Sequence, residues 1–257
     1  MRPQNLPRIS ARYWCAIVVA SMAGANTGDF AARYLHLGHT RGLLPLALIF
    51  LAIAWAETRA RRATEVYYWL AIIVLRTGAT NLADLATHDL RLGYPLTLAV
   101  LAGLIIAVVL FAYWRDGSAA PAAADGRKLP ATDSAYWLAM LTAGTLGTAG
   151  GDFVADELGL GVGYGSLVLF AVFLIVLFGA TRIGKMGIFW YWAAIVAART
   201  AGTTMGDFLP SRRGLDLGLP LSTAISLSTL ALIVLLWRDR GSAAERERRA
   251  AGELTGD

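Results

Sequence analysis

Four aspartates recur at one fixed place in a repeated pattern of the 257-residue chain. Each follows the tryptophan of a Tyr-Trp pair by fifteen residues, and the pairs begin at positions 13, 68, 136 and 191. The aspartates are Asp29, Asp84, Asp152 and Asp207. Constant spacing in four copies predicts that the four carboxylates lie at one level of the fold, where they could bind cations and exchange protons.

Oxygen-bearing side chains stand three or four residues before the aspartates, on the same face of a helix. They are Asn26, Thr80, Asn81, Thr148, Thr203 and Thr204. Carboxylate, amide and hydroxyl oxygens suit hard cations such as manganese, magnesium or calcium. One cysteine and three histidines exclude a cysteine-rich zinc or iron–sulfur site and a histidine-rich metal centre. The sequence therefore predicts a cation site made of the aspartates and these neighbours.

Repulsion among the carboxylates links cation binding to protons. Two carboxylates roughly 8 Å apart repel by about 2 kcal/mol at an effective dielectric constant of about 20, so an empty ring is expected to hold protons that a cation displaces. Arg76 and Arg199 are the expected charge partners and leave a formal charge of minus two, which a divalent cation balances. The alternative is structural: each aspartate caps a helix end or pairs with an arginine.

The elements that carry the aspartates form a fourfold repeat. The chain reads NTGDF, NLADL, AGGDF and TMGDF around them, and a Leu-Gly pair follows each, two residues later in the last copy. Arg-Thr precedes the aspartate in the second and fourth copies alone, which indicates a duplicated pair of repeats. We predict a first half at 1–114 with repeats 12–57 and 66–114, a cytoplasmic linker at 115–133, a second half at 134–238 with repeats 134–181 and 188–238, and a charged cytoplasmic tail at 239–257.

Composition places these repeats in a membrane. The chain is 56% hydrophobic and 16% charged, and its mean hydropathy is +0.54. Apolar runs at 94–114, 162–180 and 219–237 each match the ~20 residues that cross a bilayer. More polar stretches begin at Tyr13, Tyr67, Tyr136 and Phe189, and a run at 43–56 extends toward Glu65. We therefore predict an all-α integral membrane protein with eight transmembrane helices.

The positive charges predict the orientation. Sixteen Lys and Arg residues fall in the termini and in the segments that join the repeats, against five on the other side, so both termini are expected in the cytoplasm. Four two-helix repeats then share one orientation, with a pseudo-twofold or pseudo-fourfold axis along the membrane normal. The Tyr-Trp pairs are interpreted as interfacial anchors, and the aspartates lie roughly 22 Å further along the helices.

Small residues on the aspartate-bearing helices are predicted to allow close helix packing. They are Gly24, Gly28, Gly144, Gly147, Gly150, Gly151, Gly202 and Gly206.

With the four tryptophans Trp14, Trp69, Trp137 and Trp192 and its Gly-Asp-Phe-like turns, the chain resembles a family of bacterial multi-pass membrane proteins. That family is built from four tandem copies of a two-span "repeat of unknown function". The resemblance covers almost the whole chain and implies the architecture, without a settled substrate.

The sequence favours a transporter in the bacterial cytoplasmic membrane. We expect a proton-coupled exporter of a divalent metal cation such as manganese, with the bilayer, the cation and protons as its partners and with no resident cofactor. A cation channel with pseudo-fourfold symmetry is the alternative. A non-transporting scaffold and an intramembrane aspartyl enzyme are more remote, since Gly150-Gly151-Asp152 only resembles part of an aspartyl protease motif. Enzymatic activity and nucleic-acid binding are not expected, and a homo-oligomer is left open.

Overall fold

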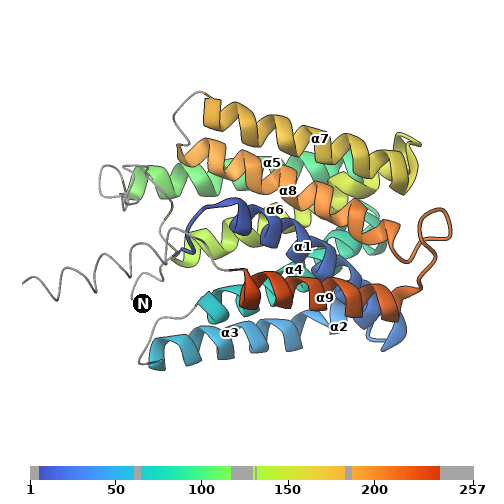
Figure 1. Cartoon of the computed structure of the whole chain (residues 1–257), viewed down its shortest axis with the longest axis horizontal. Helices are drawn as coiled ribbons and strands as arrows, with labels where there is room; N and C mark the ends of the chain where they lie inside the picture. The colour runs from blue at the N-terminus through green and yellow to red at the C-terminus, as the bar shows by residue number, and fades with distance from the viewer. Residues whose placement is uncertain (1–5, 61–64, 117–129, 131, 183–186, 238–257) are drawn as a thin grey trace, which may run out of the picture.

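The computed structural model describes residues 6–60, 65–116, 130, 132–182 and 187–237. In this part of the chain eight long α-helices alternate between the inside and the outside of one bundle (Figure 1). The inner helices are α1 (Ala11–Asp29), α4 (Glu65–Asp84), α6 (Ser134–Asp152) and α8 (Ile188–Phe208). The outer helices are α3 (Leu43–Arg59), α5 (Gly93–Asp116), α7 (Gly161–Arg182) and α9 (Leu219–Leu236), and a short helix, α2 (Gly38–Arg41), precedes α3.

Burial separates the two sets of helices. Most of α1 and α4 is buried, whereas α3 buries no residue fully and α5, α7 and α9 expose long apolar side chains. Six helical segments of the described chain are long and apolar enough to cross a membrane, namely those containing α1, α3, α4, α5, α7 and α9. The helices α6 and α8 are not among them; both are rich in Gly and Thr and pack between other helices.

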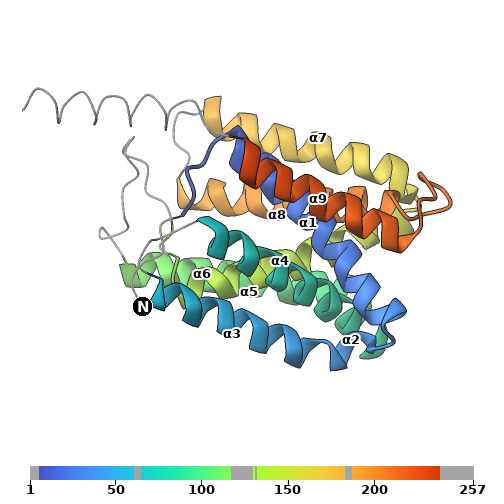
Figure 2. The same cartoon turned by 60° about the horizontal axis from the view of Figure 1, so that its bottom comes forward.

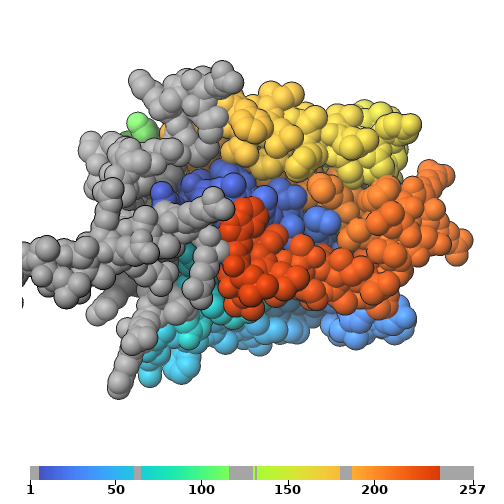
Figure 3. All heavy atoms as spheres, in the orientation of Figure 1, coloured from blue at the N-terminus to red at the C-terminus, as the bar shows by residue number. Residues whose placement is uncertain are grey.

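The inner helices form a closed ring. Helix α1 packs against α4, α4 against α6, α6 against α8, and α8 against α1. Each outer helix packs on the inner helix of the following repeat: α3 on α4, α5 on α6, and α7 on α8. The last helix, α9, returns to α1, and Figure 3 shows atoms of α1 in a narrow strip between α7 and α9. Every repeat is therefore completed by its neighbour.

One arginine fastens this closure. Arg12, at the start of α1, donates from Nη2 to the carbonyl oxygen of Val234 in the last turn of α9, at 2.8 Å. Its Nη1 lies 2.7 Å from Glu65 Oε2 at the start of α4. A cation beside the last carbonyls of a helix is a favourable arrangement, so Arg12 links three helices from different repeats.

Glycines let the inner helices approach closely, as predicted. A Cβ on Gly147 would lie 2.7 Å from Arg199 Cβ and 2.9 Å from its carbonyl carbon, and one on Gly202 would lie 2.6 Å from the Val18 carbonyl oxygen. Gly24 and Gly28 face Arg76 and Thr80 of α4 in the same way. Spacings of small-xxx-small type bring helix backbones together in membrane proteins, where packing replaces the hydrophobic drive between helices.

The turn after each aspartate explains the repeated Leu-Gly. In the first three copies the helix widens into one π-helical turn, at Phe30–Tyr34, Leu85–Asp89 and Phe153–Glu157. The residue before the leucine then has a left-handed backbone conformation, and so does the glycine after the leucine. In the first copy these are His36 and Gly38, with φ of 55° and 63°. In the fourth copy the two extra residues replace the π-helical turn by the turns after Phe208.

Two predicted segments are largely outside the described residues. The linker at 115–133 includes the undescribed positions 117–129 and 131, and the tail at 239–257 is not described. The described end of the linker leads into α6, where Asp133 Oδ1 accepts a hydrogen bond from the Tyr136 amide at 2.9 Å. This is an N-cap, which supplies an acceptor for a backbone N–H that has no partner within the helix.

Candidate functional site

Each inner helix carries a stripe of residues spaced four apart that ends in its aspartate. Residues at this spacing lie along one ridge of a helix, and packed ridges of this kind are common between crossing helices. Hydrogen bonds between different inner helices within the stripes show that these ridges meet at the bundle axis. From the start of the helices the axis passes layers of tyrosine, large apolar residues, arginine, threonine and aspartate. Figure 2 shows the inner helices enclosed by the outer ones.

The first layer is a closed ring of four tyrosine hydroxyls. The oxygen–oxygen distances are 3.1 Å from Tyr13 to Tyr68, 2.7 Å from Tyr68 to Tyr136, 3.0 Å from Tyr136 to Tyr191 and 2.6 Å from Tyr191 to Tyr13. All four side chains are at most 2% exposed. Because each hydroxyl donates once and accepts once in such a cycle, its proton is fully used within the ring.

The anchor interpretation of the Tyr-Trp pairs was therefore wrong. An interfacial anchor needs its polar tip at the lipid headgroups. The tyrosine hydroxyls instead find partners at the axis, and Trp14, Trp69 and Trp192 are buried beside them, between 3% and 6% exposed. Trp14 packs on Phe173 of α7, so these pairs fill the bundle at this level.

The apolar layer lies one turn further along. It consists of Ile17, Ile72, Met140 and Ile195, each no more than 2% exposed. Together with the tyrosine ring it closes the start of the axis.

The arginine layer holds two buried guanidinium groups, each on a 1% exposed residue, from opposite helices of the inner ring. Arg76 donates from Nη1 to Thr80 Oγ1 at 2.9 Å and to Thr148 Oγ1 at 2.8 Å, and from Nη2 to Thr203 Oγ1. Arg199 has longer contacts, 3.5 Å to Ser21 Oγ and 3.5 Å to Met140 Sδ. The contacts of Arg76 lie toward the aspartates, in the threonine layer, and the Arg199 contact with Met140 lies toward the tyrosines, in the apolar layer.

The expected pairing of these arginines with the aspartates is not direct. No ion pair joins Arg76 or Arg199 to an acid in the described part of the chain, although Arg76 is within Coulombic range of Asp84, Asp152 and Asp207. Three of the hydroxyls predicted to bind a cation explain this, because Thr80, Thr148 and Thr203 accept hydrogen bonds from the Arg76 guanidinium instead. Thr204 lies in the contact between α6 and α8, where its hydroxyl donates to carbonyls of its own helix.

The two asparagines have a different setting. The Asn81 amide nitrogen lies against Gly42, where a Cβ would be 3.0 Å away, so this side chain faces the start of α3. The backbone carbonyl of Asn26 accepts a hydrogen bond from Thr223 of α9 at 3.2 Å. Both amide groups are buried without a hydrogen-bond partner among the residues that the structure describes. These residues therefore belong to contacts between inner and outer helices as well as to the aspartate end of the bundle.

The aspartates lie at the same end of the inner helices, at or next to the last residue of each. Asp152 is within Coulombic range of Asp29, Asp84 and Asp207. Asp29 pairs with Arg33 at 3.3 Å, and neither Asp152 nor Asp207 has an ion pair among the described residues. No group of three or more His, Cys, Asp or Glu side chains in this part of the chain is close enough to hold one metal ion.

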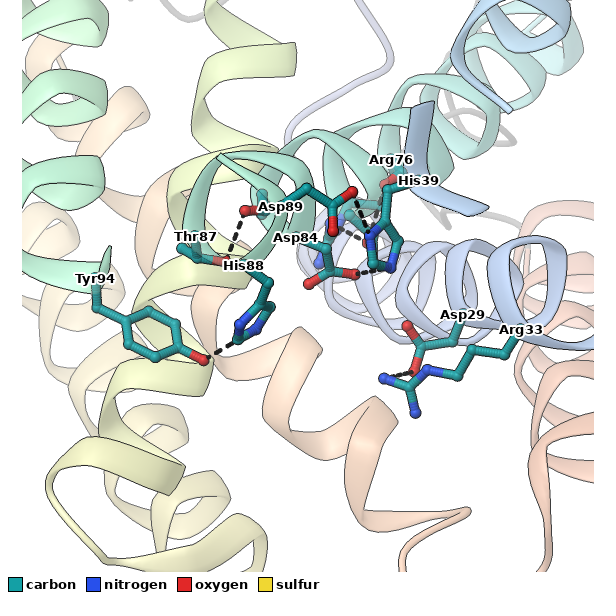
Figure 4. Close-up of polar contacts among 11 residues, drawn as sticks. Asp29, Arg33, His39, Arg76, Asp84, Thr87, His88, Asp89 and Tyr94 are labelled. Carbon is teal, nitrogen blue, oxygen red and sulfur yellow. Dashed lines mark hydrogen bonds and ion pairs between the residues drawn. The ribbon is translucent and has the colours of Figure 1, made fainter. Parts of the chain in front are cut away.

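A histidine outside the predicted site contacts the second aspartate. Figure 4 shows His39 between two carboxylates, with Nε2 3.7 Å from Asp84 Oδ2 and Nδ1 3.1 Å from Asp89 Oδ2. Side-chain exposure falls from 44% at Asp89 through 22% at His39 to 12% at Asp84. His39 follows Leu37 by two residues, just as Tyr94 follows Leu92 in the next repeat, so the two residues occupy equivalent positions. Tyr94 contacts His88 and Phe153.

Comparison with known proteins agrees with the repeated architecture. Four consecutive segments, at 12–63, 67–118, 135–185 and 190–241, match one family of repeats. Neither a curated protein nor a solved structure matches the chain. The matches cover most of the sequence, and the chain therefore belongs to the family described as "Repeat of Unknown Function (DUF347)".

Proposed function

We propose that this protein is an integral membrane transporter for a hard cation, coupled to protons through the four aspartates. The observation that carries the proposal is the position of Asp29, Asp84, Asp152 and Asp207 at the same end of the four inner helices. Ionisable groups inside a membrane bundle are costly and mark substrate or proton pathways.

The outer surface supports a bilayer as the surroundings. Leu44, Leu48 and Leu51 of α3 are between 58% and 68% exposed, and Leu167 and Ile175 of α7 are about as open. Continuous apolar faces of this kind suit lipid, since helices satisfy their own backbone hydrogen bonds. We propose eight membrane-crossing helices in the bacterial cytoplasmic membrane, with the tyrosine end and both termini toward the cytoplasm.

A transporter is favoured over a cation channel. The tyrosine ring and the apolar layer leave the axis no open path at its start, so passage requires a change of conformation. Arginines in alternate repeats reduce the fourfold symmetry to twofold, which suits two halves that move against each other.

The cation is proposed to bind with part of its water shell. No three metal-ligating side chains converge in the described residues, so a fully dehydrated ion would lack ligands. Small divalent cations give up water reluctantly and are often held by one or two carboxylates with several waters. A manganese-like divalent ion therefore remains the substrate proposed from the sequence.

Flux measurements test this proposal. Full-length protein is placed in liposomes that contain a pH-sensitive dye, and a manganese gradient is applied across the membrane. The dye records whether protons move in the direction opposite to manganese. We expect Asp152→Asn and Asp207→Asn to lower the coupled flux at least tenfold, while Glu157→Gln, an exposed acid one turn further on, keeps it. Wild-type coupling in all four single Asp→Asn variants contradicts the proposal.

A further inference from the structure

Arg199 is a buried cation with almost no partners. Its side chain belongs to a 1% exposed residue, and its Nε has no hydrogen-bond acceptor among the described residues. Of its five N–H donors, those on the terminal nitrogens reach Ser21 Oγ and Met140 Sδ, each at 3.5 Å, and no other acceptor in the described part of the chain. A thioether is a weak acceptor, and 3.5 Å is at the limit of a hydrogen bond. Arg76, the equivalent residue two repeats earlier, has three threonine hydroxyls instead.

The surroundings do not neutralise the Arg199 charge. No ion pair connects it to an acid among the described residues, and its charged neighbour in the same layer is Arg76, which is within Coulombic range. On the other side lies the tyrosine ring, whose four hydroxyl protons are used within the ring. A buried guanidinium without a counter-charge is strongly unfavourable, so this layer lacks a negative partner.

Neighbouring groups pack closely around Arg199. Gly147 packs directly on the Arg199 backbone and Cβ, and Ser21 already donates to the carbonyl oxygen of Ile17 at 2.9 Å. The apolar layer and the tyrosine ring are buried on the tyrosine side of Arg199. A partner must therefore be small and must accept hydrogen bonds from the unused N–H groups of the arginines.

We propose that the arginine layer binds a small monovalent inorganic anion, such as chloride or nitrate, at the Arg199 guanidinium. The free N–H groups of Arg199 hold the anion, and the charge of Arg76, whose Nε also has no acceptor, stabilises it. Arginine suits this role because its guanidinium stays charged and presents several donors in a fixed plane. The anion site is separate from the aspartate level and does not depend on cation transport.

Thermal unfolding of the purified protein tests the site. Full-length protein in detergent is measured in sodium gluconate, and chloride, bromide or nitrate then replaces gluconate at constant ionic strength. Because a ligand that binds only the folded protein stabilises it, the wild-type Tm should rise and saturate. Arg199→Gln should abolish this shift and Arg199→Lys should retain part of it. Arg213→Gln, which changes an exposed arginine, should keep the full shift.

Two results overturn the proposal. One is a Tm that does not respond to these anions in the wild-type protein, and the other is a shift of equal size in Arg199→Gln, which reflects a general salt effect. If Arg199→Gln does not fold, crystals of the wild-type protein grown in bromide decide the question by anomalous diffraction. A bromide peak beside the Arg199 guanidinium supports the site, and density for water alone at that place refutes it.

Discussion

The hydroxyl oxygens of Tyr13 and Tyr191 lie 2.6 Å apart, although 178 positions separate the two residues in the chain. This contact joins the first repeat to the last and completes the ring that Tyr68 and Tyr136 continue. A network that depends on all four helices reports on the closure of the whole bundle, and it can be perturbed one hydroxyl at a time.

Removing one ring hydroxyl should destabilise the protein. Tyr13→Phe leaves Tyr68 and Tyr191 each without one partner in a fully buried setting, at a cost of about 1–3 kcal/mol. Tm measured in detergent should fall, and by a similar amount for the same change at each of the other three tyrosines. Tyr164→Phe is the matched control, since Tyr164 is 74% exposed. An unchanged Tm for all four ring variants shows that the ring adds no stability.

Gly147→Ala should be strongly destabilising. The added Cβ meets the Arg199 backbone at 2.9 Å, so α6 and α8 must separate, and forced overpacking costs about 1–3 kcal/mol. Gly103→Ala on α5 is the control because its Cβ would have no atom within 4 Å. Chemical unfolding in mixed micelles measures both variants, and equal stabilities contradict the close packing.

Arg12→Ala should loosen α9 without unfolding the bundle. The change frees the Val234 carbonyl and the Glu65 carboxylate, and thereby the contact between the last helix and the start of α1 and α4. Hydrogen–deuterium exchange followed by mass spectrometry should show faster exchange in the last turns of α9. Arg213→Ala, at an exposed position, should leave the exchange of α9 as in the wild type. Faster exchange spread evenly over all helices is inconsistent with a local role.

The proposed orientation can be tested by cysteine labelling, because the chain contains a single cysteine that can be replaced. Cys15→Ser gives a chain without cysteine, into which Thr58→Cys or Arg213→Cys is introduced at exposed positions. Thr58 lies at the end of α3, next to Arg59, and Arg213 lies between α8 and α9 at the other end of the bundle. A membrane-impermeant maleimide should label Arg213→Cys in intact cells and Thr58→Cys only after permeabilisation. Labelling of both from the outside contradicts the orientation.

The sequence was sufficient for the helices and for the end of the helices at which the aspartates lie. Apolar runs and the stretches that begin near the Tyr-Trp pairs indicated the long helices. The fixed interval from tryptophan to aspartate indicated that the four aspartates lie at the same end of the inner helices, because identical spacings in parallel helices produce one level. The close approach at Gly24, Gly147 and Gly202 also followed from residue type, since small side chains permit backbone contact.

The direction of the tyrosines could not be read from composition alone, because a tyrosine at the start of a membrane helix fits an interfacial position equally well. A signal was nevertheless present: Tyr136, Thr148 and Asp152 differ by multiples of four, so one ridge carries all three. His39 was missed because its partners Asp84 and Asp89 come from the following repeat. Such a contact depends on how one copy packs on the next, which no spacing within a copy encodes.

The packing of each outer helix on the following inner helix has a consequence for shorter chains. A protein with only the first two repeats would leave α1 without the helix that covers it and would leave α5 with nothing to cover. In a pair of identical half-length molecules, α5 of each could pack on α1 of the other. Such a half-length protein would therefore close the ring of inner helices as a homodimer. Gene duplication followed by fusion then accounts for a chain whose arginines alternate between copies.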